Sequence, residues 1–368
     1  MTKPVAAFLP TIFTFWMERQ FSGGEIATRM MDAAAAIGYE LRVISTPKQK
    51  MSNSYAALKL PWLKNRKGID AANKLIAEHG VNALWVRKSG LYDLSGIGCD
   101  VHSPASADTV RLIDDKYAFT KSLGNDPTRA NTIVATTPRA VMAAYKRLRD
   151  QGEEVAVKPA DNGVFGFGYW HLTEGEESLI FSDPDRRRMH PRVYAKGLKT
   201  EFARNNKGLK GLIRRAAYSL GWLRGKDLRR ILVMEWLPGP EVSIDVLCWN
   251  GEPLIHAARV KASENTQVIK SDHPMVEHAR MLARKHQLHG IISVQYRCDE
   301  NGSWKILEIN PRPAGGCIHS EDAGFQIITM WTWLVLGVIR PEDVPQHQLH
   351  DKKIVEFVRT PHIQNTDD

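Results

Sequence analysis

The sequence lacks a long hydrophobic run, since no uninterrupted apolar stretch approaches the roughly 20 residues of a membrane-spanning helix. It also lacks a signal-peptide cleavage pattern, although Lys3 stands near the start. Cysteine is scarce, with four in 368 residues and no CxxC pair. This spacing indicates neither a disulfide framework nor a zinc knuckle. We therefore predict a cytoplasmic protein of roughly two or three domains with no membrane association.

Acidic residues are scarce in one segment. The formal net charge is +9, yet residues 185–230 hold fifteen Lys and Arg against three acids, a local charge of +12. Such a block could attract an anionic substrate, nucleic acid or an acidic partner. Aromatic side chains for base stacking are missing through most of it, which disfavours nucleic acid without excluding it. The alternative is a solvated basic insertion.

Short apolar runs and helical patterns alternate through the first hundred residues. The runs that indicate strands lie at residues 5–9, 41–45, 83–86 and 99–102, and helical patterns lie at 25–37 and 69–79. Strands that alternate with helices are typical of a parallel α/β domain. We assign this domain to residues 1–108.

A strand and a glycine-rich loop adjoin in the middle of the chain. Residues 154–158 predict a strand that ends at Lys158, and Gly163, Gly166 and Gly168 follow it. Glycines let a backbone approach a polyphosphate closely, and the lysine could neutralise its charge. The alternative is an exposed lysine followed by a hairpin turn. Nearby patterns predict helices at 115–122 and 138–150 and a strand at 132–135.

The C-terminal part is richer in strands. They are predicted at residues 230–236, 241–249, 254–261 and 291–297, with a helix at 274–286. A last helix is predicted at 324–336. Its Trp331 and Trp333 are expected to pack in the core rather than to form a binding surface.

Glu308, Asn310 and Arg312 occur at i, i+2 and i+4 at the end of an apolar strand. In an extended segment alternate side chains project to one side, so these three can converge on one ligand. A carboxylate and an amide oxygen suit Mg²⁺, and a guanidinium suits phosphate. The pattern therefore predicts a metal and phosphate site. The alternative is a polar strand end that Pro311 and Pro313 terminate.

Four motifs in order resemble the ATP-grasp superfamily over about residues 105–340. They are Asp115-Lys116, Lys158 with its glycine-rich loop, the segment MEWLPGPE at 234–241, and EINPR at 308–312. The PGPE turn is similar to that of D-alanine:D-alanine ligase. The ending INPRPAGG resembles ATP-grasp proteins encoded in stress or tellurite-resistance gene clusters.

The resemblance implies an α/β fold with an α+β lid, in which ATP is held between two α+β subdomains. Residues 1–108 would be the parallel α/β pre-ATP-grasp domain. Residues 109–230 would be the central and lid subdomain, with the basic insertion at 185–230. Residues 231–358 would be the C-terminal subdomain with the metal site, and 359–368 a tail.

The resemblance also assigns roles to nucleotide-binding residues. The phosphates of ATP would meet two lysines and a flap of three glycines, namely Lys116, Lys158, Gly163, Gly166 and Gly168. The backbone of the hinge, Glu235, Trp236 and Leu237, would read adenine, and Glu241 would accept from the ribose hydroxyls.

The implied metal ligands are Glu308, Asn310 and Gln295, for two Mg²⁺ ions or for Mn²⁺ in their place. Gln295 departs from the pattern, because many ligases of this group have a carboxylate thirteen residues before the shared glutamate. Carbamoyl phosphate synthetase has Gln at its equivalent position, so an amide oxygen can serve there. The amide lowers the negative charge of the site. The alternative is a buried amide that bonds a neighbouring strand.

Three basic residues complete the implied catalytic set: Arg312, Arg259 and Lys261. They would stabilise the transferred phosphoryl group and an acyl-phosphate intermediate. The implied activity is ATP-dependent ligation of a small-molecule carboxylate to an amine, with release of ADP and phosphate. The alternatives are an ATP-grasp phosphotransferase and a non-catalytic nucleotide-binding protein whose basic segment binds a partner. A homodimer is a further option for the assembly.

Overall fold

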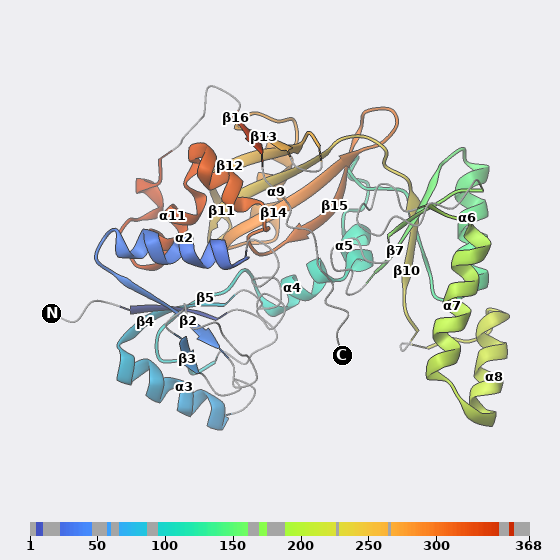
Figure 1. Cartoon of the computed structure of the whole chain (residues 1–368), viewed down its shortest axis with the longest axis horizontal. Coiled ribbons are helices and arrows are strands. Elements are labelled where there is room, and N and C mark those ends of the chain that lie inside the picture. The colour runs from blue at the N-terminus through green and yellow to red at the C-terminus, as the bar shows by residue number, and fades with distance from the viewer. Residues whose placement is uncertain are drawn as a thin grey trace. The chain divides into compact units, whose positions relative to one another are not determined.

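The computed structural model describes most of the chain (Figure 1). The described residues are 5–9, 23–45, 57–59, 66–86, 95–160, 169–174, 188–225, 228–263, 266–345 and 353–356. The chain divides into two compact units. Unit 1 comprises Met1–Ile113, Pro240–Tyr296 and Glu308–Asp368, and unit 2 comprises Asp114–Gly239 and Arg297–Leu307. The three-domain boundaries expected from the sequence stay predictions.

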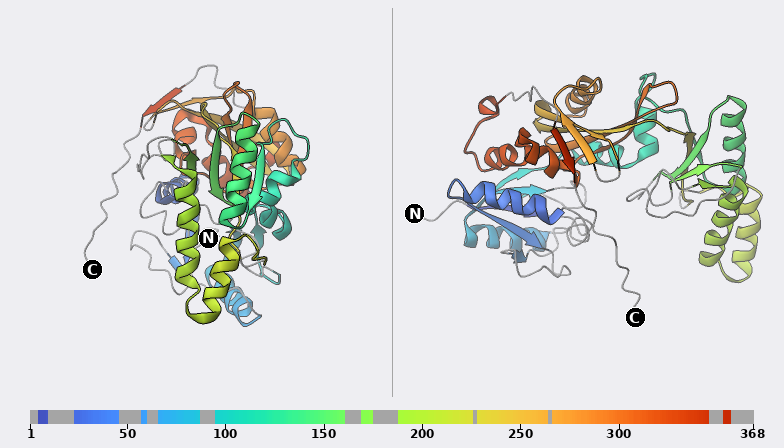
Figure 2. Two further views of the ribbon diagram at one scale, coloured as in Figure 1. Left: turned by 90° about the vertical axis from the view of Figure 1, so that its right-hand side faces the viewer. Right: turned by 45° about the horizontal axis from the view of Figure 1, so that its top comes forward.

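Unit 1 contains a five-stranded parallel sheet with the order β3-β2-β1-β4-β5. Its strands are β1 (Val5–Leu9), β2 (Glu40–Ser45), β3 (Ala57–Lys59), β4 (Val81–Val86) and β5 (Asp100–His102). Two helices, α2 (Gly23–Ala35) and α3 (Arg66–His79), lie on opposite faces of it (Figures 1 and 2). The predicted parallel α/β arrangement is therefore confirmed.

Unit 1 also carries most of a six-stranded sheet with the order β15-β14-β11-β12-β13-β16. Its strands are β11 (Glu241–Trp249), β12 (Glu252–Lys261), β13 (Thr266–Lys270), β14 (Gly290–Cys298), β15 (Trp304–Asn310) and β16 (Lys353–Glu356). The pairs β11–β12, β12–β13 and β13–β16 are antiparallel. The helices that follow the strands are α9 (Val276–Lys285), α10 (Cys317–Ser320), the π-helical turn η2 (Glu321–Phe325) and α11 (Ile327–Val335).

The largest core cluster joins α11 to α2 and to the strands of unit 1. Trp331 on α11 is completely buried and packs edge-on against Trp85 of β4. Trp333 donates its indole N–H to the Ala33 carbonyl of α2 at 3.0 Å. The prediction that both tryptophans pack in the core is confirmed. Truncation of Trp331 to Ala is expected to cost about 3–5 kcal/mol.

Unit 2 is built around a sheet with the order β6-β10-β7-β8-β9. Its strands are β6 (Thr132–Ala135), β7 (Val155–Pro159), β8 (Trp170–Leu172), β9 (Arg188–Met189) and β10 (Ile231–Glu235). Helix α4 (Ala107–Asp114) precedes it, and α5 (Lys116–Ser122), α6 (Pro138–Asp150), α7 (Pro191–Asn205) and α8 (Gly208–Ser219) belong to it. Val141 and Leu148 of α6 pack with Val157 and Val233 of the sheet.

Much of the basic insertion is helical, because α7 and α8 fill its described part. Helix α7 begins after the His190 cap and buries Tyr194 and Leu198. Helix α8 packs on α7 through Tyr218, whose ring stacks on Phe202 with centroids 4.0 Å apart. In the described part of the chain no helix combines the length and the apolarity of a membrane span.

Candidate functional site

The end of β15 brings two of the expected metal ligands together. The Asn310 amide nitrogen donates to the Glu308 carboxylate at 3.0 Å, so both side chains lie on one side of the strand. Ile309 between them is 3% exposed and points into the core. Arg312 follows the strand, is half-buried and donates to the Pro313 carbonyl at 3.2 Å. The strand end therefore presents a carboxylate and an amide in contact.

The donor set at this strand end is small. Among the described residues no three His, Cys, Asp or Glu side chains are grouped as for a metal ion. Gln295 of β14 is half-buried within a strand whose neighbouring positions Val294 and Tyr296 are fully buried. Mg²⁺ typically takes one or two protein carboxylates and fills its octahedron with phosphate oxygens and water. Glu308 and Asn310 fit such an ion if most of its ligands come with a nucleotide.

Arg259 is buried in a two-point ion pair with Asp245. Its Nε lies 2.6 Å from Asp245 Oδ2, and a terminal nitrogen lies 3.0 Å from Oδ1. Ser320 donates its hydroxyl to the same carboxylate at 2.9 Å, and the other terminal nitrogen of Arg259 donates to Gln267 at 3.2 Å. Burial opposes the charged guanidinium, but attraction and hydrogen bonds from Asp245 outweigh it and raise the pKa of Arg259. The guanidinium of Arg259 therefore keeps its positive charge.

The Arg259 guanidinium also fixes the loop that follows the Pro-Arg-Pro sequence. A Cβ atom at Gly316 would overlap the terminal nitrogen of Arg259, so any other residue there would force the guanidinium to shift. Cys317 next to it is completely buried, and burial raises the pKa of its thiol well above its usual value. The thiol is thus suited to packing rather than to nucleophilic attack.

Sequence reasoning missed Asp245. A carboxylate at the centre of the apolar strand β11 is 0% exposed, and such a charge needs a cationic partner. Lys261 and Glu241, which the sequence singled out, are both half-buried at the ends of β12 and β11. Glu241 lies close enough to Arg259 to contribute to its raised pKa. The catalytic roles of Arg259 and Lys261 stay predictions.

In unit 2 the expected phosphate-binding lysines lie near each other. The Lys116 backbone N–H donates to the Ala160 carbonyl at 3.2 Å, two residues beyond Lys158. Lys158 ends close to β15, with its Nζ 3.5 Å from the Leu307 carbonyl. Asp115 caps α5 by accepting from two backbone N–H groups.

An ion pair that the sequence did not suggest stabilises the region where the start of α5 meets the end of β7. Arg230 donates to Asp115 at 2.8 Å, and its carbonyl accepts from the Ala160 N–H at 2.9 Å. The start of α5, the end of β7 and the residue before β10 are thereby tied together. This region holds three cationic side chains, which belong to Lys116, Lys158 and Arg230, and such a set suits a polyphosphate.

The hinge segment after β10 is anchored by its own backbone and side chains. Asn131 donates its N–H to the Glu235 carboxylate at 2.8 Å, and the Trp236 N–H donates to the Glu154 carbonyl at 2.8 Å. Burial raises the pKa of Glu235, against the opposing effect of the Asn131 hydrogen bond. Leu237 is completely buried. The Glu235 side chain therefore has a structural partner.

Trp236 is held by aromatic packing. Its ring stacks on His171 with centroids 4.1 Å apart and planes at 3°, and the Arg297 guanidinium lies 5.6 Å from the ring centroid. Tyr169 stacks on the same ring at 5.6 Å. The predicted flap glycines Gly163, Gly166 and Gly168 lie outside the described residues.

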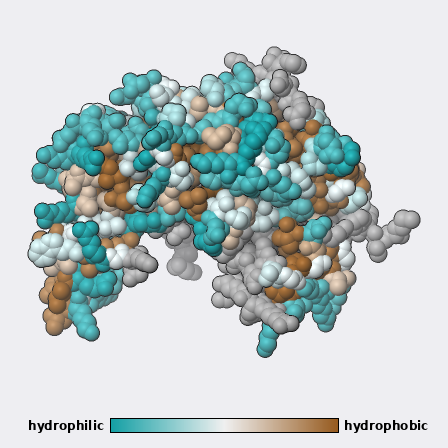
Figure 3. All heavy atoms as spheres, turned by 180° about the vertical axis from the view of Figure 1, so that it is seen from behind, coloured by the Kyte–Doolittle hydropathy of each residue, from teal (hydrophilic) through white to brown (hydrophobic). Residues whose placement is uncertain are grey.

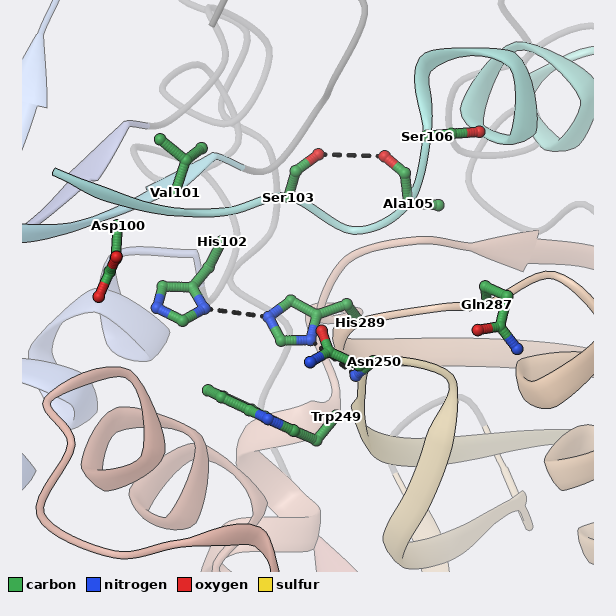
Figure 4. A pocket seen from close by; sticks show the side chains of 10 residues that line it. All are labelled: Asp100, Val101, His102, Ser103, Ala105, Ser106, Trp249, Asn250, Gln287 and His289. Carbon is green, nitrogen blue, oxygen red and sulfur yellow. Dashed lines mark hydrogen bonds between the residues drawn. The ribbon is translucent and has the colours of Figure 1, made fainter. Parts of the chain in front are cut away.

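A polar pocket of about 500 Å³ lies in unit 1, and none of the site residues described above lines it (Figure 4). Figure 4 shows His102 and His289 pointing toward each other across it, and His102 Nδ1 lies 3.0 Å from His289 Nε2. Asn250 donates its backbone N–H to His289 Nδ1 at 3.0 Å. Burial lowers the pKa of both rings, and that of His289 falls to about 4.

Residues 227–357 match the model of a family described as "ATP-grasp in the biosynthetic pathway with Ter operon". No curated protein sequence matches the chain significantly. The matched segment contains Glu241, Arg259, Gln295, Glu308 and Asn310.

Several solved structures share the fold. The N5-carboxyaminoimidazole synthetase of Staphylococcus aureus complexed with ADP is 12% identical, with TM-score 0.55, and covers 96% of this chain and 80% of its own. The biotin carboxylase domain dimer of the Hydrogenobacter thermophilus 2-oxoglutarate carboxylase, with MgADP and bicarbonate, is 13% identical, with TM-score 0.57 and coverages of 96% and 74%. The L-amino acid ligase of Bacillus licheniformis is 10% identical, with TM-score 0.54 and coverages of 94% and 78%.

Proposed function

The chain has the ATP-grasp fold, and on that premise we propose that it is an ATP-dependent carboxylate–amine ligase that releases ADP and phosphate. The observation that carries the proposal is the contact between Glu308 and Asn310 at the end of β15. A carboxylate that accepts from the amide nitrogen of a neighbouring asparagine, inside the segment that matches the ATP-grasp family, gives a magnesium nucleotide a carboxylate and an amide side by side.

The residues proposed to bind the nucleotide keep the roles that the sequence resemblance implies. Lys116 and Lys158 would neutralise its phosphates, and their proximity through Ala160 supports a shared role. The anchored hinge Glu235–Leu237 would read adenine through its backbone, and Glu241 would accept from the ribose hydroxyls. Two structural relatives carry ADP, one of them with magnesium, which supports ATP and Mg²⁺ as the ligands.

The chemistry needs positioning and charge stabilisation rather than a covalent enzyme intermediate. The γ-phosphoryl group moves from ATP to the substrate carboxylate, and ADP leaves. The amine then attacks the carbonyl carbon of the acyl phosphate, phosphate departs with the bonding electrons, and the amine nitrogen loses a proton. Magnesium, held by Glu308, Asn310 and Gln295, would offset negative charge between the nucleotide and the carboxylate.

Arg312 and Arg259 would have different roles in binding anions. Arg312 lies two residues after the end of β15 and would face the transferred phosphoryl group with Lys261. Arg259 keeps two of its nitrogens on Asp245, so less of its charge remains for an anion. Its remaining nitrogen lies beside Gly316, and through it Arg259 would also shape the loop that carries Arg312.

The direct test is product analysis with the full-length protein. ATP, Mg²⁺ and paired libraries of carboxylates and amines are incubated with the enzyme, and ADP and new amides are measured by mass spectrometry. Amide formed in proportion to ADP supports the ligase. ADP with a phosphorylated hydroxyl compound and no amide would assign a phosphotransferase instead, and ATP binding without any ADP release would assign a non-catalytic protein.

A further inference from the structure

Helix α8 in the basic insertion carries an exposed apolar stripe. Leu209, Leu212 and Ile213 are 78%, 54% and 68% exposed. Ala216 and Leu220 are exposed as well, so the spacing is i, i+3, i+4, i+7 and i+11. On a helix this spacing forms one continuous face. Figure 3 shows apolar surface at the α7–α8 hairpin, at the lower left of the view.

The stripe is concentrated at this hairpin rather than spread over the protein. Eight large hydrophobic side chains are exposed in the part of the chain that the structure describes. Six of them lie between residues 193 and 222, and the other two are Met281 and Val338. A contiguous exposed apolar patch on a soluble domain usually marks an interaction surface.

The opposite face of α8 is already used for packing. Gly211 and Tyr218 are buried against α7 and its following turn, and a Cβ at Gly211 would overlap the Asn206 backbone. The orientation of the helix is therefore determined by its inner face. The apolar stripe points outward because of that packing.

The charges around the stripe have one sign. Residues 206–225 contain five basic residues and no acidic residue. Lys210 and Arg214 border one edge of the stripe on the helix and Arg215 borders the other. Trp222, which is 70% exposed, follows the end of the helix. An apolar face flanked by Lys and Arg, with tryptophan at its edge, is the pattern of a helix that lies in a bilayer interface.

We propose that the outer face of α8 binds the surface of an anionic lipid bilayer. Leu209, Leu212 and Ile213 would enter the headgroup region, and the flanking basic residues would pair with lipid phosphates. A second copy of this face would bring five positive charges against five, which disfavours self-association through it. The sequence alone predicted no membrane association, because a search for spanning segments overlooks an amphipathic helix that lies flat.

The test is flotation of the full-length protein with vesicles of phosphatidylcholine containing about one third phosphatidylglycerol. We expect several-fold more protein to float with these vesicles than with pure phosphatidylcholine, and the excess to shrink as salt is added. Serine at Leu209, Leu212 and Ile213 should abolish flotation. All three side chains are exposed, so the variant should keep its circular dichroism and melting temperature.

A matched control carries serine at Met281 and Val338, which are exposed apolar residues elsewhere, and should float like the wild type. Neutralisation of Lys210, Arg214 and Arg215 to glutamine should flatten the salt dependence. The emission of the wild type should shift to the blue with anionic vesicles, and Trp222→Phe should remove most of the shift.

Four results would overturn the proposal. The first is a wild type that ignores anionic vesicles, and the second is a serine triple variant that floats as well as the wild type. The third is an absence of flotation together with a complex with poly-glutamate that the triple variant loses, which would assign the face to an acidic polypeptide. A dimer that only the triple variant loses, again without flotation, would assign it to a second copy.

Discussion

Arg259 and Asp245 form a two-point ion pair in which the side chains are 4% and 0% exposed. Arg259 lies opposite Ser243 in the β11–β12 ladder, and Asp245 lies opposite Ala257. The pair is therefore a diagonal contact on one face of the sheet, where side chains two residues apart can meet. It links the middle of β11 to the Gly316 loop and to Ser320 of α10.

Removal of one member of this pair should be more harmful than removal of both. Asp245→Ala leaves a buried guanidinium without its counter-charge and is expected to lower the free energy of unfolding by about 3–5 kcal/mol. The double variant Asp245→Ala/Arg259→Leu should lose less. Urea unfolding followed by tryptophan fluorescence measures both. Equal losses in the single and double variants would show that the pairing itself contributes little.

Gly316→Ala should disturb the same network from the loop. The new Cβ would overlap a terminal nitrogen of Arg259, and we expect a loss of about 1–3 kcal/mol with reduced ADP release. Gly197→Ala is the matched control, since a Cβ there meets no atom within 4 Å inside α7 and should stabilise the helix slightly. A neutral Gly316→Ala variant would mean that the guanidinium can move aside without cost.

Local sequence signals located many of the elements. Thr137 before Pro138 is an N-cap followed by proline in the first turn, and α6 begins there as predicted. Strand β11 has the bounds predicted from its apolar residues. At these places the hydrophobic periodicity and the residues that begin or end an element predict the same structure. Tertiary contacts therefore did not change the local preference.

Other features depend on contacts that no local pattern contains. Ser243 and Asp245 alternate with apolar residues, which suggests a solvent face, yet they are 7% and 0% exposed because that face is covered too. Helices α7 and α8 were not predicted, since glycines and dense positive charge obscure their periodicity. The Arg230–Asp115 ion pair joins residues 115 positions apart. The proximity of Glu308 and Asn310 could be predicted from the sequence, because both residues belong to one strand.

Glu308→Gln should abolish turnover without unfolding the protein. The substitution keeps the volume and the contact with Asn310 but removes the negative charge that the proposed metal needs. We expect ADP release to fall at least about a hundredfold. The control is Glu300→Gln, in the exposed turn before β15, which should leave ADP release unchanged. Near-normal ADP release by Glu308→Gln would contradict the metal assignment.

Asn310→Ala should share the loss of turnover but respond to magnesium. It removes one neutral donor and leaves the Glu308 carboxylate in place, so a higher Mg²⁺ concentration should recover part of the activity. Titration of Mg²⁺ at saturating ATP measures this recovery. No recovery at any magnesium concentration would point to a role for Asn310 other than metal binding.

Lys158→Ala should weaken ATP binding by roughly 2 kcal/mol, about thirtyfold, because a half-buried cation at the phosphates is lost. Glu241→Ala should weaken binding less and keep the preference for ATP over GTP, since adenine would be read by the hinge backbone. Calorimetry with both nucleotides measures these effects. Lys146→Ala, an exposed lysine on α6, is the control. Unchanged ATP affinity in both site variants would refute the placement of the nucleotide.

The His102–His289 contact should make the stability of unit 1 depend on pH. Asn250 donates to His289 Nδ1, so neutral His289 carries its proton on Nε2 and donates it to His102. Burial and the neighbouring His102 lower the pKa of His289 from 6.5 to about 4. For His102, burial lowers the pKa against the opposing charge of Asp100. The folded state thus binds fewer protons than the unfolded state between these pH values.

Stability should therefore be fully present above pH 6.5 and decline as the pH falls toward about 4. His289 alone can contribute a slope of up to about 1.4 kcal/mol per pH unit in that window. His289→Gln, whose amide does not titrate, should flatten the dependence by about this amount, although it is expected to be less stable at neutral pH. Urea unfolding at a series of pH values measures both slopes. Parallel curves for the wild type and the variant would show that His289 is protonated equally in the folded and unfolded states.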